Sequence, residues 1–390
     1  MSRFLFYDDK IVNLLLENEK PTGGAAVQAL NWIKGLLEEG HEVALMTNAP
    51  KEKLKPEYRT LKLLPIFDDK KGMRWIRWVS YRIPYIHKQI QDYKPDYLYQ
   101  GVPGWQSMVL ALICKKLRIE FLMRISSDAM VDDRFLRKYS KPHQMVVENA
   151  FSLADCIICQ NEYQFGQMQE KYPNNKILKI TNPIEYKPTT NSYAWQGHIL
   201  WLGLFKAVKN LGLLHEIAIL LPKEKFVVAG EPAKSIDSKT QEYIQKLEKL
   251  PNVEFVGFLQ KSEVSNYLAG AKFLLNTSLF EGFSNTFLEA MQVHTPILTT
   301  NKVNPDQIIT NHNLGITYDT AEELKNKIEN LTEEEIIGKR ESIQKYLYNY
   351  HHHRHLAKKL VAALTENTNN SRKRLLDTLT MRPLKTSMAK

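Results

Sequence analysis

The sequence has few cysteines and none of the spacing that a disulfide framework requires. Its 390 residues contain three cysteines, Cys114, Cys156 and Cys159, which fit a reducing compartment. Cys156 and Cys159 form a C-x-x-C pattern inside an apolar strand, where residues three apart point to opposite faces. We therefore expect a buried structural role for this pair rather than a redox or metal site.

Long apolar segments are also missing. The longest apolar run, 108–114, is far shorter than the roughly 20 residues that span a membrane. Acidic residues near the N-terminus come before any long apolar region and no small-residue cleavage site follows, so we expect no signal peptide. We expect a cytoplasmic chain, with peripheral attachment to the inner face of the cell membrane as a further option.

Four common nucleotide and metal signatures are absent as well. The sequence contains no G-x-x-x-x-G-K-[ST] loop, no G-x-G-x-x-G fingerprint, no H-E-x-x-H and no Asp-x-Asp pair. A histidine cluster at 351–355 has no neighbouring carboxylate or thiol, so we expect a solvated helix face there. These absences predict neither a bound metal nor a cofactor.

The composition that is present is that of a basic globular protein. Hydrophobic residues make up 43% and charged residues 25%, and a chain of this length predicts two domains or three small ones. Lys and Arg number 53 against 43 Asp and Glu, a formal charge of +10 that favours anionic partners. The charge does not choose between nucleotides, nucleic acid and an acidic membrane surface.

Short apolar runs alternate with amphipathic segments along the whole chain. This alternation predicts α/β units on parallel sheets that are covered on both faces. We expect strands in the first half at RFLFY, HEVALMTN, PDYLYQGV, EFLMRIS, DCIICQN and KILKITN, and in the second at HILWLG, KFVVAGEP, VEFVGF, KFLLNTS and TPILTT. Between the halves, the polar stretch 186–197 has no helical period and predicts an inter-domain linker.

The segment MRWIRWVSYRIPYIHK, 73–88, interleaves aromatic with basic residues. Such a mixture is found on ordinary surface helices, on helices that lie on membranes and in nucleic-acid grooves. The apolar and basic residues do not separate onto two faces, and Pro84 limits the helix. We favour a surface helix, keep an anionic membrane surface as a candidate partner, and expect no nucleic acid.

The stretch KFLLNTSLFEGFSNTFLEAMQVHTPILTT, 272–300, carries the most chemical information. A buried strand leads into a loop with Glu281, and a helix with Glu289 begins near Asn285. Ligands of open α/β sheets bind beyond the carboxyl ends of strands, where a helix N-terminus offers N–H groups to an anion. Ser284 and Thr286 beside Asn285 can therefore present backbone N–H groups to a phosphate, between two carboxylates that suit sugar hydroxyls. Alternatively, Thr286-x-x-Glu289 is a capping box and Glu281 a solvated loop residue.

Within this stretch EGFSNTFLEAM resembles the E-G-F-x-x-x-x-x-E signature of the family 4 retaining glycosyltransferases. Other pieces follow in that family's order from about 21 to 365: PTGGAAVQALNWIKGLLEEGHEVALMT, YKPDYLYQG, ITNPIEY, ILWLGLFKAVKNLGLL, FVVAGEP and VEFVGFLQKSEVSNYLAGAKFLL. The resemblance implies the GT-B fold, α/β with two Rossmann-like doubly wound domains facing each other across a cleft.

The resemblance also implies how the chain divides. An acceptor domain would occupy 1–185 and a nucleotide-sugar donor domain 198–345. A C-terminal helix, 346–368, would return to the first domain. A basic tail, 369–390, would follow, poorly ordered or attracted to anionic lipid.

Roles in the donor site are implied by the same resemblance. Glu281 and Lys209 would be catalytic, with Glu281 at the donor sugar and Lys209 at the diphosphate. Glu289 would bind the ribose hydroxyls. Further donor contacts would come from Gly23, Gly24, Gly203, Asn210, Gly230, Phe258, Phe283, Ser284, Asn285 and Thr286.

Two departures from the family pattern concern this site. Leu204 stands where the family usually has an arginine, so a bidentate hydrogen-bond donor to the phosphate is missing. Lys206 could replace that arginine only in part, because an ammonium acts as a point charge. Ser127-Asp128 stands where members often have His-Asp, so these two residues are weaker site candidates.

The implied activity is metal-independent transfer of a sugar, with retention, from a nucleotide sugar to a saccharide or lipid-linked acceptor in cell-surface glycan biosynthesis. Three alternatives remain: a GT-B phosphorylase, a nucleotide-sugar epimerase and a non-catalytic nucleotide-sugar binder. The sequence leaves the oligomeric state open.

Overall fold

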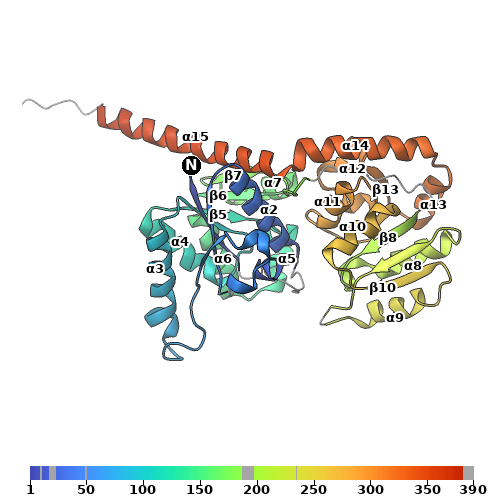
Figure 1. Ribbon diagram of the computed structural model, residues 1–390, viewed down its shortest axis with the longest axis horizontal. Helices are drawn as coiled ribbons and strands as arrows, with labels where there is room; N and C mark the ends of the chain where they lie inside the picture. The colour runs from blue at the N-terminus through green and yellow to red at the C-terminus, as the bar shows by residue number, and fades with distance from the viewer. Residues whose placement is uncertain (9–10, 17–22, 49–50, 187–196, 234, 381–390) are drawn as a thin grey trace, which may run out of the picture.

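Two parallel sheets, each covered by helices, lie side by side in the computed structural model of the protein (Figure 1). The structure describes residues 1–8, 11–16, 23–48, 51–186, 197–233 and 235–380. The α/β fold class predicted from the sequence is confirmed. Apart from residues 186 and 197, the predicted linker 186–197 lies outside the described residues.

The first sheet has seven strands in the order β3-β2-β1-β4-β5-β6-β7, all parallel. Successive residues of β1 face opposite cores, because Leu5 packs on one face and Phe4 and Phe6 on the other. Its strands are β1 (Arg3–Tyr7), β2 (Glu42–Met46), β3 (Lys62–Leu64), β4 (Tyr97–Gln100), β5 (Glu120–Arg124), β6 (Cys156–Cys159) and β7 (Lys176–Lys179). Its helices are α1 (Val12–Leu15), α2 (Gly24–Glu38), α3 (Ile83–Tyr93), α4 (Trp105–Leu117), α5 (Asp133–Lys138), α6 (Lys141–Leu153) and α7 (Glu162–Lys171).

The second sheet has six parallel strands in the order β10-β9-β8-β11-β12-β13, which is the strand order of a doubly wound nucleotide-binding fold. Its strands are β8 (His198–Leu202), β9 (Phe226–Ala229), β10 (Val253–Gly257), β11 (Ala271–Asn276), β12 (Ile297–Thr300) and β13 (Gly315–Tyr318). The helices that follow are α8 (Leu211–Leu220), α9 (Ser238–Leu247), α10 (Lys261–Ala269), α11 (Asn285–Gln292), α12 (Ile308–Asn311), α13 (Ala321–Glu329), α14 (Glu333–His351) and α15 (His353–Thr380).

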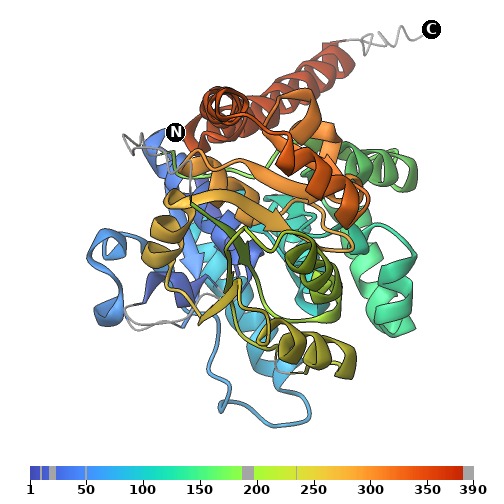
Figure 2. The ribbon, with the colours of Figure 1, turned by 90° about the vertical axis from the view of Figure 1, so that its right-hand side faces the viewer.

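The last two helices join the two halves. Helix α14 packs on α11 of the second half, and α15 packs on α2 of the first, as the orange-red helices of Figures 1 and 2 show. The break falls at His352, so the segment predicted as one helix over 346–368 belongs to two. Helix α15 is described to Thr380, which makes the first part of the predicted tail 369–390 helical.

The prediction of a solvated histidine face is wrong for His351 and His353. Both are buried where the chain returns to the first half, because they pack beside the segment that leaves it. The Nδ1 atom of His351 lies 2.7 Å from the carbonyl oxygen of Asn182, and Nε2 of His353 lies 2.9 Å from a carboxylate oxygen of Glu38. Burial lowers the pKa of His351 to about 4, so this ring is neutral at physiological pH.

The structure confirms burial of the C-x-x-C pair. Cys156 and Cys159 lie in β6 and pack into the cores on opposite faces of the sheet. Burial raises the pKa of each thiol to about 12, which leaves both protonated and unreactive at neutral pH. No helix in the described part of the chain is long and apolar enough to cross a membrane.

Candidate functional site

A cleft of about 970 Å³ lies between the two sheets, where the carboxyl ends of their strands face each other. One wall comes from segments that follow strands of the first sheet, and the other from segments that follow β8, β9, β10 and β11. This is the place where open parallel sheets bind ligands.

Most of the site residues predicted from the sequence line this cleft. They are Gly23, Gly24, Lys209, Phe258, Glu281, Phe283, Ser284, Asn285, Thr286 and Glu289. The remaining candidates are not among the lining residues: Gly203, Lys206, Asn210, Gly230, Ser127 and Asp128. Among the described residues, no group of three or more His, Cys, Asp or Glu side chains is arranged to hold a metal.

An ion pair lies at the carboxyl edge of the second sheet. The Lys209 ammonium is 2.5 Å from a carboxylate oxygen of Glu281, and both side chains are mostly buried. The hydroxyl of Ser278 donates to the same oxygen at 2.6 Å. Burial alone would raise the pKa of Glu281, but the charge and hydrogen bond of Lys209 outweigh it and lower the pKa. Glu281 is therefore ionised at neutral pH, and its burial against Lys209 contradicts the alternative of a solvated loop residue.

The N-terminus of α11 opens into the cleft directly after this pair. Ser284 is the residue before the helix and makes no side-chain cap, so the first N–H groups of α11 are available to an anion. Helix α11 begins at Asn285, which places Thr286 inside the first turn and Glu289 in the second. The capping-box alternative for Glu289 is therefore wrong, because that pattern requires Thr286 before the helix.

Three of the candidates outside the lining have structural positions close to the ion pair. A Cβ at Gly203 would lie 3.3 Å from Cε of Lys209, so this glycine packs against the lysine stem. A Cβ at Gly230 would lie 1.9 Å from the carbonyl oxygen of Gly203, so Gly230 is required by backbone packing. The side chain of Asn210 accepts from the N–H of Leu213 at the start of α8.

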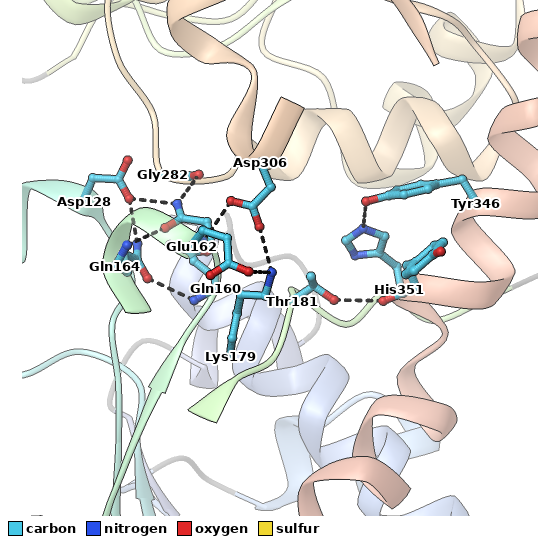
Figure 3. A network of polar contacts seen from close by, with 12 residues as sticks. Asp128, Gln160, Glu162, Gln164, Lys179, Thr181, Gly282, Asp306, Tyr346 and His351 are labelled. Carbon is cyan, nitrogen blue, oxygen red and sulfur yellow. Dashed lines mark hydrogen bonds and ion pairs between the residues drawn. The ribbon is translucent and has the colours of Figure 1, made fainter. Parts of the chain in front are cut away.

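The three weaker candidates, Ser127, Lys206 and Asp128, also lie outside the lining of the cleft. Ser127 and Lys206 are exposed as whole residues. Partial desolvation of the Lys206 ammonium and the charge of neighbouring Lys209 lower the pKa of Lys206. Asp128 accepts hydrogen bonds from Asn161 at 3.0 Å and Gln164 at 2.8 Å (Figure 3). Burial raises the pKa of Asp128 despite these two hydrogen bonds. Its carboxylate lies outside the lining of the cleft and also beside the second half, because a Cβ placed on Gly282 would lie 2.8 Å from it.

Polar contacts join the two halves beside the cleft. Asn161 donates to the carbonyl oxygen of Gly282 at 2.9 Å, and Lys179 lies 3.3 Å from Asp306 (Figure 3). Nearer the cleft, Gln28 of α2 donates to the side chain of Asn285 at 2.6 Å. The two walls are thus in direct contact at several points.

The first wall also contains polar residues that the sequence reasoning missed. Arg124, Gln160, Gln28 and Asn182 line the cleft, and all four are buried. A charged residue at the carboxyl end of an apolar strand was the available signal for Arg124. No comparable signal marks Gln28, Gln160 or Asn182, because the sheet edge brings them together from separate strands and helices.

A second cavity of about 690 Å³ lies in the first half and shares Val102 with the cleft. At its other end the Arg82 guanidinium lies 4.4 Å from the ring centroid of Phe67 and 4.8 Å from that of Trp78. Arg82 also pairs with Asp69 at 2.8 Å. This cavity therefore combines aromatic faces with hydrogen-bonding groups beside the main cleft.

Family models match both halves of the chain. The model described as glycosyltransferase family 4 matches residues 22–187, and that described as glycosyl transferases group 1 matches residues 186–350. Together they span the two sheets and the cleft between them.

Individual relatives are more distant. An uncharacterized glycosyltransferase of Methanocaldococcus jannaschii is 25% identical over 60% of this chain and 64% of its own length. O-antigen chain mannosyltransferase B of Escherichia coli is 24% identical over 33% of this chain and 35% of its own length. The matched segments thus span less than two thirds of these two relatives. The crystal structure of Anabaena HepE with UDP and glucose superposes with a TM-score of 0.71 at 15% identity, over 94% of this chain and 100% of that one.

Proposed function

This chain belongs to the GT-B glycosyltransferases of family 4, and we propose that it moves a sugar from a nucleotide-sugar donor to a saccharide acceptor. The observation that carries the proposal is the Lys209–Glu281 pair beside the open N-terminus of α11, inside a cleft between two parallel sheets. UDP and glucose in the HepE crystal structure, and the mannosyl transfer named for the Escherichia coli relative, support a nucleotide-sugar donor.

The donor would lie along the second wall. The diphosphate meets the Lys209 ammonium and the N–H groups at the start of α11, two positive groups that suit an anion. The carboxylate of Glu289, one turn further along α11, suits the ribose hydroxyls. Glu281 meets the sugar at the reacting carbon.

Transfer proceeds with retention and without a metal in this proposal. The bond between the sugar C1 and the phosphate oxygen breaks, and a bond forms between C1 and the acceptor oxygen. The acceptor proton passes to the departing phosphate. Lys209 and the α11 terminus stabilise the charge that grows on that phosphate, which is the step where fixed positive groups act most. A covalent sugar ester of Glu281 is the competing route.

The acceptor would occupy the second cavity. Val102 lines both spaces, so a hydroxyl held there can approach the donor sugar from the first half. Aromatic faces such as Trp78 and Phe67 suit the apolar faces of sugar rings, and neighbouring Thr47 and Asn48 suit their hydroxyls.

The exposed segment beside that cavity supports an acceptor carried on a lipid. Trp75 is 95% exposed and Val79 is 74% exposed, and Met73 is exposed beside them. Basic residues Arg74 and Arg77 accompany these apolar side chains, which is the combination that binds anionic membrane surfaces. We propose that this segment holds the enzyme on the cytoplasmic face of a membrane while a cell-surface glycan is assembled.

Thermal unfolding without added metal tests the donor site. UDP, GDP, ADP, CMP and their sugar conjugates are added in turn, and a ligand at about 100 times its Kd should stabilise the fold by roughly 2.7 kcal/mol. Glu289→Ala should abolish the shift given by the matching nucleotide. A shift that survives Glu289→Ala contradicts the placement of the ribose, and no shift with any nucleotide contradicts the transferase proposal.

Product analysis tests the chemistry. Nuclear magnetic resonance of the first-formed product should show the anomeric configuration of the donor, and activity should survive EDTA. A sugar ester of Glu281 trapped by mass spectrometry would replace the direct route with the covalent one. Sedimentation with anionic vesicles tests the membrane contact, because Trp75→Ala with Val79→Asp should lower binding without changing donor affinity.

A further inference from the structure

Arg124 is a buried cation that forms no ion pair with any residue that the structure describes. It ends β5, is 2% exposed and lines the cleft. One end nitrogen, Nη2, donates to the side chain of Asn182, and the guanidinium lies 5.9 Å from the ring centroid of Trp32. The other end nitrogen, Nη1, has no hydrogen-bond partner in the described part of the chain.

The ionisable groups that act on this guanidinium do not neutralise it. They are the phenol of Tyr99 and the thiol of Cys159, and burial raises the pKa of both. Both groups are therefore uncharged at neutral pH. A buried charge that lacks a partner is costly, because its lost hydration is not replaced. Because Arg124 lines a cleft, a bound ligand of opposite charge would supply the missing partner.

Gln160 points to the same conclusion independently. It follows β6, is 3% exposed and also lines the cleft. Its backbone N–H donates to Gln164 at 3.0 Å, but its side-chain Nε2 has no partner among the described residues. A Cβ placed on Gly282 would lie 3.0 Å from that nitrogen, so the free amide lies next to the loop that carries Glu281. Two unpartnered N–H donors on one wall suit a ligand rich in acceptor oxygens.

We propose that Arg124 binds a phosphate oxygen of the donor diphosphate from the first wall, with Gln160 as a second, neutral donor. This inference rests on the proposed function. Leu204 is 48% exposed on the second wall, at the position where the family resemblance implies an arginine. Arg124 restores a guanidinium to the site from the opposite side. The diphosphate is then held fully only when both walls face it, so donor binding and domain closure are coupled.

The test measures three Kd values: those of inorganic pyrophosphate, of the nucleoside diphosphate that stabilises the protein in the unfolding experiment, and of the matching nucleoside. Arg124→Met should raise the Kd of pyrophosphate and that of the nucleoside diphosphate about 10- to 100-fold, since hydrogen bonds to a charged partner are lost. It should leave the nucleoside Kd unchanged. Arg124→Lys keeps a charge but loses the planar fork, so its loss should be smaller. The midpoint of thermal unfolding without ligand should not fall in Arg124→Met, because an unpaired buried charge is removed.

Arg340→Met is the matched control, because Arg340 is equally buried in the second half, does not line the cleft and donates to the carbonyl oxygen of Ala271. Because it lies outside the cleft, this variant should leave all three Kd values unchanged. An unchanged pyrophosphate Kd in both Arg124 variants overturns the inference, even if the acceptor KM rises. If the wild-type protein binds neither pyrophosphate nor any nucleotide, the proposed function fails together with this inference.

Discussion

The two walls of the cleft are built from the same parallel-strand pattern but balance their charges differently. On the second wall, the buried cation Lys209 already has a partner of opposite charge, because it lies 2.5 Å from Glu281. On the first wall, Arg124 is buried and forms no ion pair with any described residue. In the proposed complex, a diphosphate would therefore share Lys209 with Glu281 on one wall and give Arg124 its missing partner on the other.

Removing the cation of the second wall should have the largest effect. Lys209→Met takes away the charge that faces the departing phosphate, and loss of one such group typically costs about 100- to 1,000-fold in kcat. Steady-state kinetics with the identified donor measure it. Lys225→Met is the control, since Lys225 forms an exposed ion pair with Glu254 at 2.7 Å outside the cleft. Equal losses of kcat in both variants would show that the effect is not specific to Lys209. The distinction between the charges of the two walls would then have no consequence for catalysis.

The same variant should weaken the stability that Glu281 contributes at neutral pH. In the wild-type protein the pKa of Glu281 is lowered, so its stabilising contribution is present at neutral pH and lost as pH falls through that lowered value. Without Lys209, only the hydrogen bonds of Ser278 and Ser284 oppose the effect of burial, so the pKa of Glu281 should rise and its stabilising contribution at neutral pH should shrink. Free energies of unfolding from pH 4 to pH 8 should therefore diverge most at neutral pH. Parallel curves would mean that Glu281 is not held by Lys209.

The second wall was largely predictable because its determinants are close together in sequence. Glu281, Asn285 and Glu289 lie in one loop and helix, and a short motif identified them. The first wall was not predictable in this way, because Arg124, Gln160 and their neighbours lie at or after the ends of different strands, and only the order of the strands in the sheet brings them together. A residue's side-chain partners are set by that order, and a single sequence does not state it.

The fold shows the same limit at its edges. The predicted central strands all form, whereas β3 (Lys62–Leu64) and β13 (Gly315–Tyr318) were not predicted. Both are edge strands with one strand neighbour each, but so are β7 and β10, which were predicted, so position at an edge does not by itself explain why β3 and β13 were missed. The histidine prediction failed because burial of His351 depends on the return of the chain to a distant segment.

Contact between the walls should be sensitive to a single methyl group. A Cβ at Gly24 would lie 2.1 Å from Nδ2 of Asn285, so Gly24→Ala must push the walls apart or displace that side chain. Overpacking of this kind costs about 1–3 kcal/mol, which corresponds to a loss of roughly 30-fold in kcat/KM at the middle of that range. Gly338→Ala is the control, because no atom lies within 4 Å of a Cβ placed there.

A double variant makes this test specific. With Asn285→Ala in place, Gly24→Ala should cost much less, since the clashing nitrogen is gone. Additive losses in the double variant would show that Gly24 acts on the ligand alone and not on contact between the walls.

The smallest effect should come from the exposed ion pair that also joins the two halves. Lys179 lies 3.3 Å from Asp306, and both side chains are partly exposed, so solvent screens their attraction. Such pairs contribute about 0.2–1 kcal/mol, so Lys179→Ala should raise the donor KM by about fivefold at most, and 1 M salt should remove the difference. Lys171→Ala breaks a pair with Glu148 inside the first half and should leave KM unchanged. A tenfold change for Lys179→Ala would instead mean that surface charges, rather than the buried groups of the two walls, control closure of the cleft.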